Sequence, residues 1–320
     1  MTAPEMTPLF ARCVARQLAA IFQTCDAAVL ELGAGSGRLA ADLLAALDAA
    51  GRTPRRYLIL EVSPELRERQ HETIHARVPA LAGRVEWIER MPERLTGAVL
   101  LNEVLDAIPV HLVARRGGAW FERGVGVADG RFAIEDRPLP AGRLHRLAGE
   151  RFPPDVDYAS EINVAAEALV ELLARRLDAG AIVAIDYGFP RHEYYHPQRA
   201  SGTLMGHYRH RAHSDPFLWP GLSDLTAHVD FTAIAEAGVR AGLEVAGFST
   251  QAAFLLGNGM LDRLAEVGAP ESLPYIREAA AVQKLLSPAE MGELFKVLAL
   301  ARGEGIDWSG FALSDMKRRL

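Results

Sequence analysis

The segment from Val29 to Gly37, V-L-E-L-G-A-G-S-G, constrains the fold of this chain more than any other stretch. Its apolar start, interrupted by a single acid, is typical of a buried parallel strand. Three glycines then alternate with other small residues, which lets the backbone turn tightly and approach a ligand closely. The following residues, from Arg38 to Ala50, combine strong helix formers with a helical leucine spacing. The order of strand, glycine turn and helix predicts the opening of a nucleotide-binding α/β fold.

The spacing of these glycines limits the class of ligand that the turn is expected to bind. The dinucleotide fingerprint G-x-G-x-x-G needs a third glycine at the first helical turn, where this chain has arginine or alanine. A nucleotide-dependent oxidoreductase is therefore only the second choice of enzyme class. The pattern acid-x-G-x-G-x-G, with Gly33, Gly35 and Gly37, instead resembles motif I of class I methyltransferases that use S-adenosylmethionine (SAM). The acid, Glu31, can take the cationic methionine moiety of SAM, directly or through water. The alternative is an ordinary glycine-rich turn.

A second apolar strand ends on an acid at the expected distance from the glycines. Residues 57–60, Y-L-I-L, are followed by Glu61 and Val62. An acid about 20 residues beyond the glycines is the expected ribose partner, because its carboxylate can accept from both hydroxyls. Val62 beside it is a further candidate for cofactor contact. The alternative is a surface glutamate, since Ser63 and Pro64 start the next helix.

The third predicted strand, residues 85–88, offers candidates for the adenine side of the cofactor. The turn after this strand lies beside the adenine in folds of this kind. Ile88 and Glu89 are therefore candidate cofactor residues, whereas Trp87 is equally consistent with a place in the core.

The fourth predicted strand, residues 98–101, leads into polar residues at the place where chemistry is expected. Ligands generally bind beyond the carboxyl ends of open parallel strands. Asn102 is a candidate cofactor residue, and Glu103 and Asp106 are candidate catalytic residues. The two acids share a face if this segment is helical. Alternatively, Glu103 points away and Asp106 caps a turn.

The remaining pattern predicts an α/β fold with a mostly parallel seven-stranded sheet, helices on both faces, and inserted β and loop segments. We expect one domain over residues 1–320, with insertions at about residues 110–157 and 189–230. Further strands are expected at residues 181–185, 243–249 and 295–300, the last of them antiparallel. Further helices are expected at residues 8–24, 161–178 and 231–242, with a short one from residue 287.

The two insertions differ in character. Residues 110–140 alternate valine and phenylalanine with turn signals, which predicts a β-meander or hairpin. The second insertion is long for a compact domain and is typical of a lid or binding loop. Its histidines have no convincing metal-ligand spacing, so we expect no metal site at these residues: His207, His210, His213 and His228.

Composition excludes several classes of protein. A net charge of -6 gives no general nucleic-acid footprint. No apolar run approaches the ~18 residues of a membrane span, and no signal or transit peptide is visible. Cys13 and Cys25 lack metal-ligand spacing and suit a reducing compartment, so a cytoplasmic location is expected.

Several blocks together resemble one protein family. They are E-L-G-A-G-S-G at 31–37, L-N-E-V-L-D-A-I-P-V-H at 101–111 and D-L-T-A-H-V-D-F at 224–231, supported by residues 61–66 and 291–300. These residues extend over nearly the whole chain. By this resemblance, the chain is identified as a member of the MidA-like methyltransferases. The resemblance implies a class I SAM-methyltransferase fold with SAM as cofactor. Because the family includes the mitochondrial complex I assembly methyltransferase, it also implies arginine methylation of a protein acceptor, such as a respiratory complex I subunit.

The resemblance also suggests roles for the candidate catalytic residues. An arginine side chain carries a guanidinium with a pKa above ~12, which two carboxylates can hold bidentately. Glu103 and Asp106 are the candidates for this grip. His228 can take a proton, or can fasten the second insertion through Asp224 or Asp230.

Members of this family usually carry an upstream segment that helps cover the cofactor site. Here T-A-P-E-M-T-P-L-F, which resembles the block before the family's first core helix, begins at residue 2. We therefore expect that the segment is absent or that the chain start is misassigned. A non-catalytic SAM-binding docking factor and a methyltransferase acting on a small molecule stay open as alternatives. The oligomeric state also stays open, a homodimer included.

Overall fold

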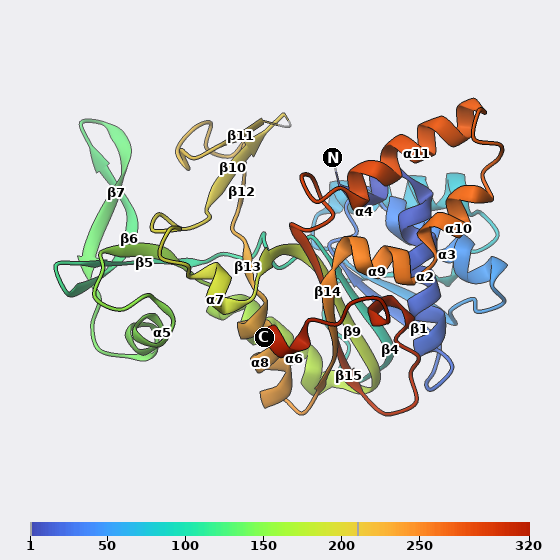
Figure 1. The fold of residues 1–320 in the computed structure, drawn as a ribbon, viewed down its shortest axis with the longest axis horizontal. Coiled ribbons are helices and arrows are strands. Elements are labelled where there is room, and N and C mark those ends of the chain that lie inside the picture. Colours follow the sequence, from blue (N-terminus) through green and yellow to red (C-terminus); the bar gives the residue numbers. More distant parts are fainter. Residues whose placement is uncertain (1, 210) are drawn as a thin grey trace. The chain divides into compact units, whose positions relative to one another are not determined.

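The computed structural model describes residues 2–209 and 211–320, which form two compact units (Figure 1). Unit 1 consists of the residues up to Val104, Glu171–Tyr187 and Ala235–Arg319, and unit 2 of Leu105–Val170 and Gly188–Ile234. Both predicted insertions fall within unit 2. The expectation of a single domain stays a prediction.

Unit 1 contains the predicted, mostly parallel sheet. Seven strands follow one another in the order β14-β15-β9-β4-β1-β2-β3, and only the pairs that include β15 are antiparallel. The antiparallel strand expected near the C-terminus is therefore confirmed. The strands are β1 (Ala28–Leu32), β2 (Arg56–Leu60), β3 (Val85–Ile88), β4 (Leu95–Asn102), β9 (Leu177–Phe189), β14 (Glu244–Thr250) and β15 (Phe295–Arg302).

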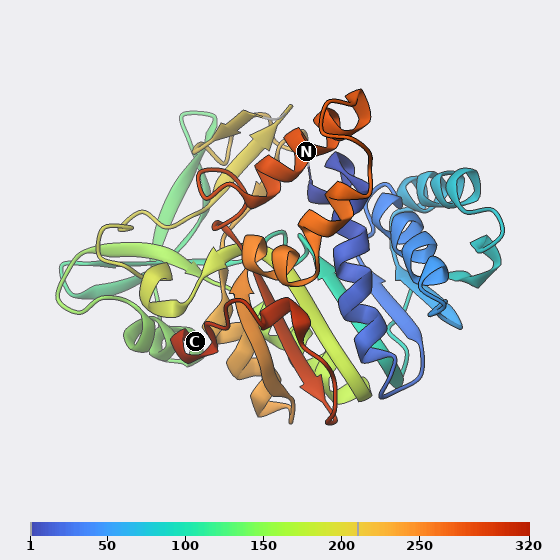
Figure 2. The same ribbon diagram turned by 45° about the vertical axis from the view of Figure 1, so that its right-hand side comes forward.

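Helices cover both faces of this sheet, as predicted. Figures 1 and 2 show α2, α3, α9 and α10 along one face, where their apolar residues join Val29, Tyr57 and Val297 in one core. On the other face, Gly238 of α8 packs so closely on Leu300 that an added Cβ would lie 2.6 Å from its Cδ1. The helices are α1 (Ala3–Met6), α2 (Pro8–Ile21), α3 (Arg38–Ala49), α4 (Pro64–Arg77), α6 (Val164–Arg176), α8 (Phe231–Arg240), α9 (Gln251–Gly257), α10 (Met260–Ala265) and α11 (Leu273–Leu286), with short 3-10 turns at Ala82–Arg84, Ser309–Phe311 and Lys317–Arg319.

The carboxyl ends of four parallel strands meet at one edge of unit 1. Pairing places Leu32 of β1 beside Leu60 of β2 and beside Leu101 of β4. It also places Leu60 beside Ile88 of β3. The residues that follow these strands therefore lie along the same edge, where the sequence places the cofactor.

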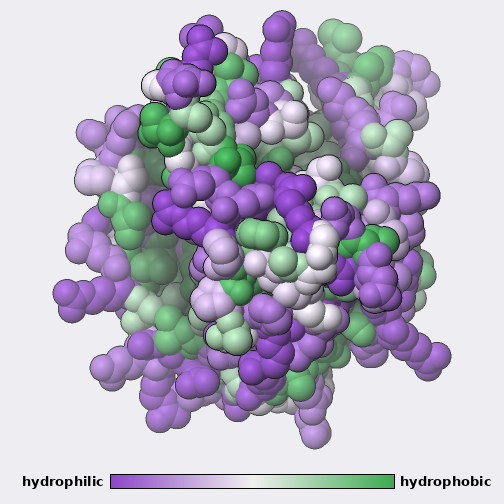
Figure 3. Space-filling view, turned by 90° about the vertical axis from the view of Figure 1, so that its left-hand side faces the viewer, coloured by the Kyte–Doolittle hydropathy of each residue, from purple (hydrophilic) through white to green (hydrophobic). Residues whose placement is uncertain are grey.

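Unit 2 is built from hairpins, as the turn signals predict for residues 110–140. One antiparallel sheet has the order β7-β6-β5-β8 and a smaller one the order β11-β10-β12. Its apolar core includes Phe152, Tyr158 and Tyr195. Other apolar side chains, such as Phe132, are exposed, and Figure 3 shows hydrophobic areas among hydrophilic ones on the surface. The elements are β5 (His111–Arg116), β6 (Ala119–Ala128), β7 (Arg131–Pro138), α5 (Arg143–Arg151), β8 (Tyr158–Ile162), α7 (Arg191–Tyr194), β10 (Met205–Tyr208), β11 (Arg211–His213), β12 (Asp224–Thr226) and β13 (Val229–Asp230), which pairs with the end of β9.

Two helix predictions need correction. The helix expected over residues 161–178 begins only at Val164, because Glu161 lies in β8, where it pairs with Leu112 of β5. The short helix expected from Ser287 is wrong, and the segment forms turns in which Gly292 N donates to Ser287 O. That segment is short because α11 ends just before it and β15 begins just after it.

Among the described helices, none has both the length and the hydropathy that crossing a membrane requires.

Candidate cofactor and active site

The glycine turn connects β1 to α3 through three residues with positive φ. The φ angles of Gly33, Gly35 and Gly37 are 66°, 54° and 81°, a region that favours glycine. A Cβ added to Gly35 would meet no heavy atom within 4 Å, so this side of the turn is open. A Cβ on Gly33 would lie 3.1 Å from Val104 Cγ2, and one on Gly37 would lie 2.9 Å from Gln70 Cα. The three glycines therefore serve different contacts, and the space beside Gly35 is the part available to a ligand.

Glu31 lies at the end of β1 with its side chain inside the protein. It is 1% exposed, and its Oε2 accepts a hydrogen bond from the Tyr57 hydroxyl at 2.7 Å. Burial raises the pKa of the Glu31 carboxyl from 4.5 to about 7, although the bond from Tyr57 acts in the opposite direction. Its contact with the methionine moiety of the cofactor stays a prediction.

Glu61 directly follows β2 and is 7% exposed. Its Oε1 accepts from Ser63 N at 2.9 Å, and its Oε2 accepts from the side-chain amide of Gln70 at 3.0 Å. Because a carboxylate oxygen has two lone pairs, each oxygen keeps one acceptor position beyond these bonds within the described chain. The carboxylate is thus prepared to accept from two neighbouring hydroxyls, and its ribose role stays a prediction. Gln70 was not a candidate from the sequence.

The other candidates around β2 and β3 differ in exposure. Val62, between Glu61 and the helix cap Ser63, is exposed, with 81% of its surface accessible. Ile88 ends β3, and its carbonyl accepts from Glu61 N at 3.4 Å. Glu89 is exposed and forms an ion pair with Arg67 at 2.9 Å. Their contact with adenine stays a prediction.

The turn after β4 holds Glu103 in a rare conformation. Its φ is 52°, which costs a non-glycine residue on the order of 1–3 kcal/mol. Two interactions with the end of β9 fix this turn: Glu103 N donates to Ile185 O at 2.9 Å, and Val104 N donates to Asp186 Oδ2 at 3.1 Å. Asp186 is fully buried, and the sequence did not mark it as a site residue. Since Val104 also contacts Gly33, the turn after β4 packs against the glycine turn.

The residues after Glu103 are not helical. The chain forms a bend and then a turn, so Glu103 and Asp106 do not share a helix face. In unit 2, Asp106 is 5% exposed, and its carbonyl accepts from Ala227 N at 3.0 Å.

His228 lies between β12 and β13 of unit 2. Its backbone N donates to Thr203 Oγ1 at 3.0 Å, and its ring stands edge-on to Phe189 at 5.4 Å. Asp230, one of the residues expected to fasten it, forms an ion pair with Arg191 at 3.4 Å.

The histidines of the second insertion have the following places. His207 lies in β10, and His213 lies in β11, where its Nε2 is 3.3 Å from Ser223 Oγ. His210 lies outside the described residues. Across the described part of the chain, no group of three or more His, Cys, Asp or Glu side chains is arranged to hold a metal ion.

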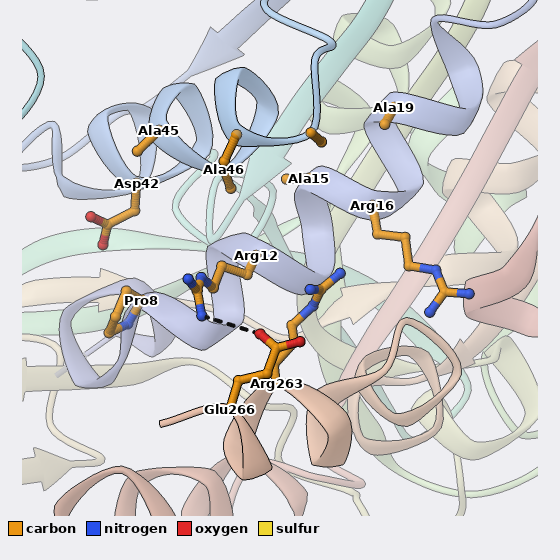
Figure 4. Close-up of a pocket in the computed structure, with 12 residues that line it drawn as sticks. Pro8, Arg12, Ala15, Arg16, Ala19, Asp42, Ala45, Ala46, Arg263 and Glu266 are labelled. Carbon is orange, nitrogen blue, oxygen red and sulfur yellow. Dashed lines mark ion pairs between the residues drawn. The ribbon is translucent and has the colours of Figure 1, made fainter. Parts of the chain in front are cut away.

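A separate cavity of about 440 Å³ in unit 1 is formed by α2, α3 and α10 (Figure 4). Alanines of α2 and α3 line it, and Arg12 forms an ion pair with Glu266 at 3.9 Å across it. Asp42, at its border, is paired with Arg38 and Arg77. It contains none of the predicted cofactor residues, which lie instead along the edge of strand ends.

A family model described as "Putative S-adenosyl-L-methionine-dependent methyltransferase" matches residues 13–249, most of the chain. The chain belongs to this family. It is thus a SAM-dependent methyltransferase, and SAM is its cofactor, as the glycine turn indicates.

Individual proteins agree with this membership, and the predicted resemblance to MidA-like methyltransferases is confirmed. The Protein arginine methyltransferase NDUFAF7 homolog, mitochondrial, of Drosophila melanogaster is 29% identical over 340 residues, which cover 95% of this chain and 75% of that protein. The Danio rerio protein of that name is 28% identical over 340 residues, covering 94% and 76%. A crystal structure from Burkholderia thailandensis bound to S-adenosyl-homocysteine is 50% identical, has a TM-score of 0.95, and is matched over 100% of this chain and 83% of that chain.

The chemistry at the strand edge of unit 1 fits SAM. The open side of Gly35 leaves space for a ligand against the turn, and Glu61 offers carboxylate lone pairs. Asn102 Oδ1 is buried and has no hydrogen-bond partner among the described residues, so it is a further acceptor for a ligand N–H. The site therefore offers acceptors for a ligand that carries hydroxyl and ammonium groups.

Proposed function

We propose that this methyltransferase transfers a methyl group to an arginine of a protein acceptor. Two observations support the proposal. Relatives that align over almost the whole chain are named protein arginine methyltransferases. In addition, an acid, Glu103, follows the strand whose carboxyl end faces the transferred methyl group in this fold.

The observation that carries most weight is the conformation of Glu103. Backbone strain of this kind persists where surrounding contacts enforce it, and it is concentrated at functional sites. Here the enforcing contacts are the Ile185 carbonyl and the buried Asp186 carboxylate. A backbone fixed in this way beside the glycine turn suits a residue that must orient a cationic acceptor. We therefore assign Glu103 to the acceptor rather than to the cofactor.

The chemistry requires alignment more than activation. SAM supplies a methyl group that its sulfonium already activates, so the protein contributes orientation and electrostatics. In the proposed mechanism, Glu103 accepts hydrogen bonds from the guanidinium and turns one nitrogen toward the methyl group. One guanidinium proton leaves after transfer. Asp106, as a second carboxylate, and His228, as a proton acceptor, remain proposed site residues of unit 2.

The acceptor follows from the family resemblance. A subunit of respiratory complex I is the proposed partner, and the proposed compartment is the cytoplasm, which the cysteine usage suits. Neither nucleic acid nor a metal ion has a part in this mechanism.

The test is methylation with SAM that carries an isotopically labelled methyl group. Purified protein is incubated with lysate proteins from cells lacking the gene, and labelled sites are mapped by mass spectrometry. The proposal expects label on arginine side chains. Label only on lysine, carboxylates or small molecules would refute arginine specificity while leaving methyl transfer intact. Binding of SAM without any transfer would favour the docking factor.

A further inference from the structure

Gln70 is an unusual residue of helix α4. This helix is mostly polar, and within it only Gln70 and Ile74 are buried. The Gln70 side chain is 0% exposed, although an amide loses its hydrogen bonds with water when it is buried. Burial of such a group requires replacement bonds from the protein.

Three separate elements provide those bonds. Gln70 Nε2 donates to Gly35 O in the glycine turn at 3.1 Å and to Glu61 Oε2 after β2 at 3.0 Å. Gln70 Oε1 accepts from Trp87 Nε1 in β3 at 2.9 Å. Both amide hydrogens and the amide oxygen are therefore used. One side chain connects the glycine turn, the candidate ribose acid and the third strand.

Trp87 determines which way the amide faces. The indole N–H is only a donor, so the Gln70 atom beside it must be the oxygen. The amide NH₂ then has to face Glu61 and Gly35, which both offer acceptors. A reversed amide would place two donors against each other and would leave the carboxylate of Glu61 opposite an oxygen.

The backbone brings α4 close enough for this contact. A Cβ on Gly37 would lie 2.9 Å from Gln70 Cα and 3.1 Å from Gln70 O. The last glycine of the turn is thus the point at which α4 rests on the turn. A side chain there would push Gln70 away from Gly35 and Glu61.

We propose that Gln70 is a positioning residue for the cofactor, oriented by Trp87, that fixes the Glu61 carboxylate and the Gly35 carbonyl in register with each other. The inference rests on the proposed place of Glu61 in the cofactor site. Fixing Oε2 on one side and Oε1 through Ser63 on the other leaves the remaining lone pairs aimed at a ligand. Gln70 touches no reacting group and acts through Glu61.

The test uses Gln70→Glu, which keeps the shape and the acceptor for Trp87 but places a carboxylate against Glu61. Two carboxylates at this distance repel each other unless they share a proton. S-adenosyl-homocysteine affinity, measured by calorimetry, should fall by about tenfold or more near pH 8. The loss of affinity should be smaller near pH 6, because a proton shared by the two carboxylates restores the hydrogen bond between residue 70 and Glu61. A merely structural role would give no such recovery.

Control variants distinguish a positioning role of Gln70 from an effect of added charge, from misfolding and from a wrong assignment of the cofactor site. Ala76→Glu adds the same charge at an exposed position of α4 and should leave affinity unchanged. If Gln70→Glu does not fold, Trp87→Phe decides, since it removes the orienting N–H together with part of the ring. Roughly threefold weaker binding is expected, and wild-type binding would contradict the inference. If Gln70→Glu folds and binds S-adenosyl-homocysteine with wild-type affinity near pH 8, while Glu61→Ala weakens binding, the positioning role of Gln70 is overturned. If Glu61→Ala has no effect either, the site assignment itself fails.

Discussion

Two buried carboxylates, Glu61 in unit 1 and Glu161 in unit 2, are used in opposite ways. Glu61 accepts two hydrogen bonds from the described chain and keeps lone pairs to spare. Glu161 accepts from Thr203 N, Thr203 Oγ1, Leu204 N and other donors, so its acceptor positions are filled. Glu61 therefore keeps acceptor positions for a ligand, whereas Glu161 fastens residues 202–204 to β8. Burial of an acid therefore does not by itself indicate a binding site, whereas unused acceptor capacity favours one.

The largest expected effect concerns the open side of the glycine turn. Gly35→Val should abolish S-adenosyl-homocysteine binding in calorimetry, because its side chain occupies the space left for the ligand. Gly51→Val is a matched control, since Gly51 also has positive φ and open space around an added Cβ. The two variants share the strain, so equal loss of binding in both would show that strain is responsible.

Glu61→Ala should weaken S-adenosyl-homocysteine binding at least about tenfold. It removes one or two hydrogen bonds to a charged acceptor, each worth roughly 1.5–3 kcal/mol. Glu65→Ala, an exposed acid of α4 paired with Arg69, should bind as the wild type does. An unchanged dissociation constant in folded Glu61→Ala would remove this residue from the site.

Glu161→Gln should change stability instead. The amide NH₂ of glutamine would face donors such as Thr203 N and leave at least one unsatisfied, at a cost of about 1–3 kcal/mol. Denaturant unfolding measures this loss, and exposed Glu150→Gln is the control. Wild-type stability of Glu161→Gln would contradict the fastening role.

An effect of similar size is the pH dependence that Glu31 contributes to stability. Its pKa is raised to about 7 in the folded protein, so the unfolded chain releases this proton first as pH rises from about 4.5. The contribution is therefore present below pH 4.5 and is lost as pH rises toward 7, by up to about 3 kcal/mol. Glu31→Gln keeps an acceptor for Tyr57 and should remove this dependence in denaturant unfolding. A variant whose pH profile matches the wild type would refute the shift.

The strand edge could be predicted from the sequence because each part of it is local. Apolar runs that end in Glu61 or Asn102 place those residues at strand ends once the sheet is parallel. Gln70 could not be found, because one glutamine in a polar helix does not differ from its exposed neighbours. Asp186 is held by a contact with the distant residue Val104, which no local pattern shows. Glu161 was assigned to a helix because its pairing with β5 is equally remote.

The central claim is that one edge of unit 1 holds the cofactor while Glu103 acts on the acceptor. Glu103→Gln keeps the shape of the side chain and removes its charge. The deciding measurement is the rate of labelled methyl transfer to arginine at saturating SAM, with S-adenosyl-homocysteine affinity measured beside it. The account predicts a strong loss of transfer with nearly unchanged affinity. Wild-type transfer, or an equal loss of affinity, would contradict it.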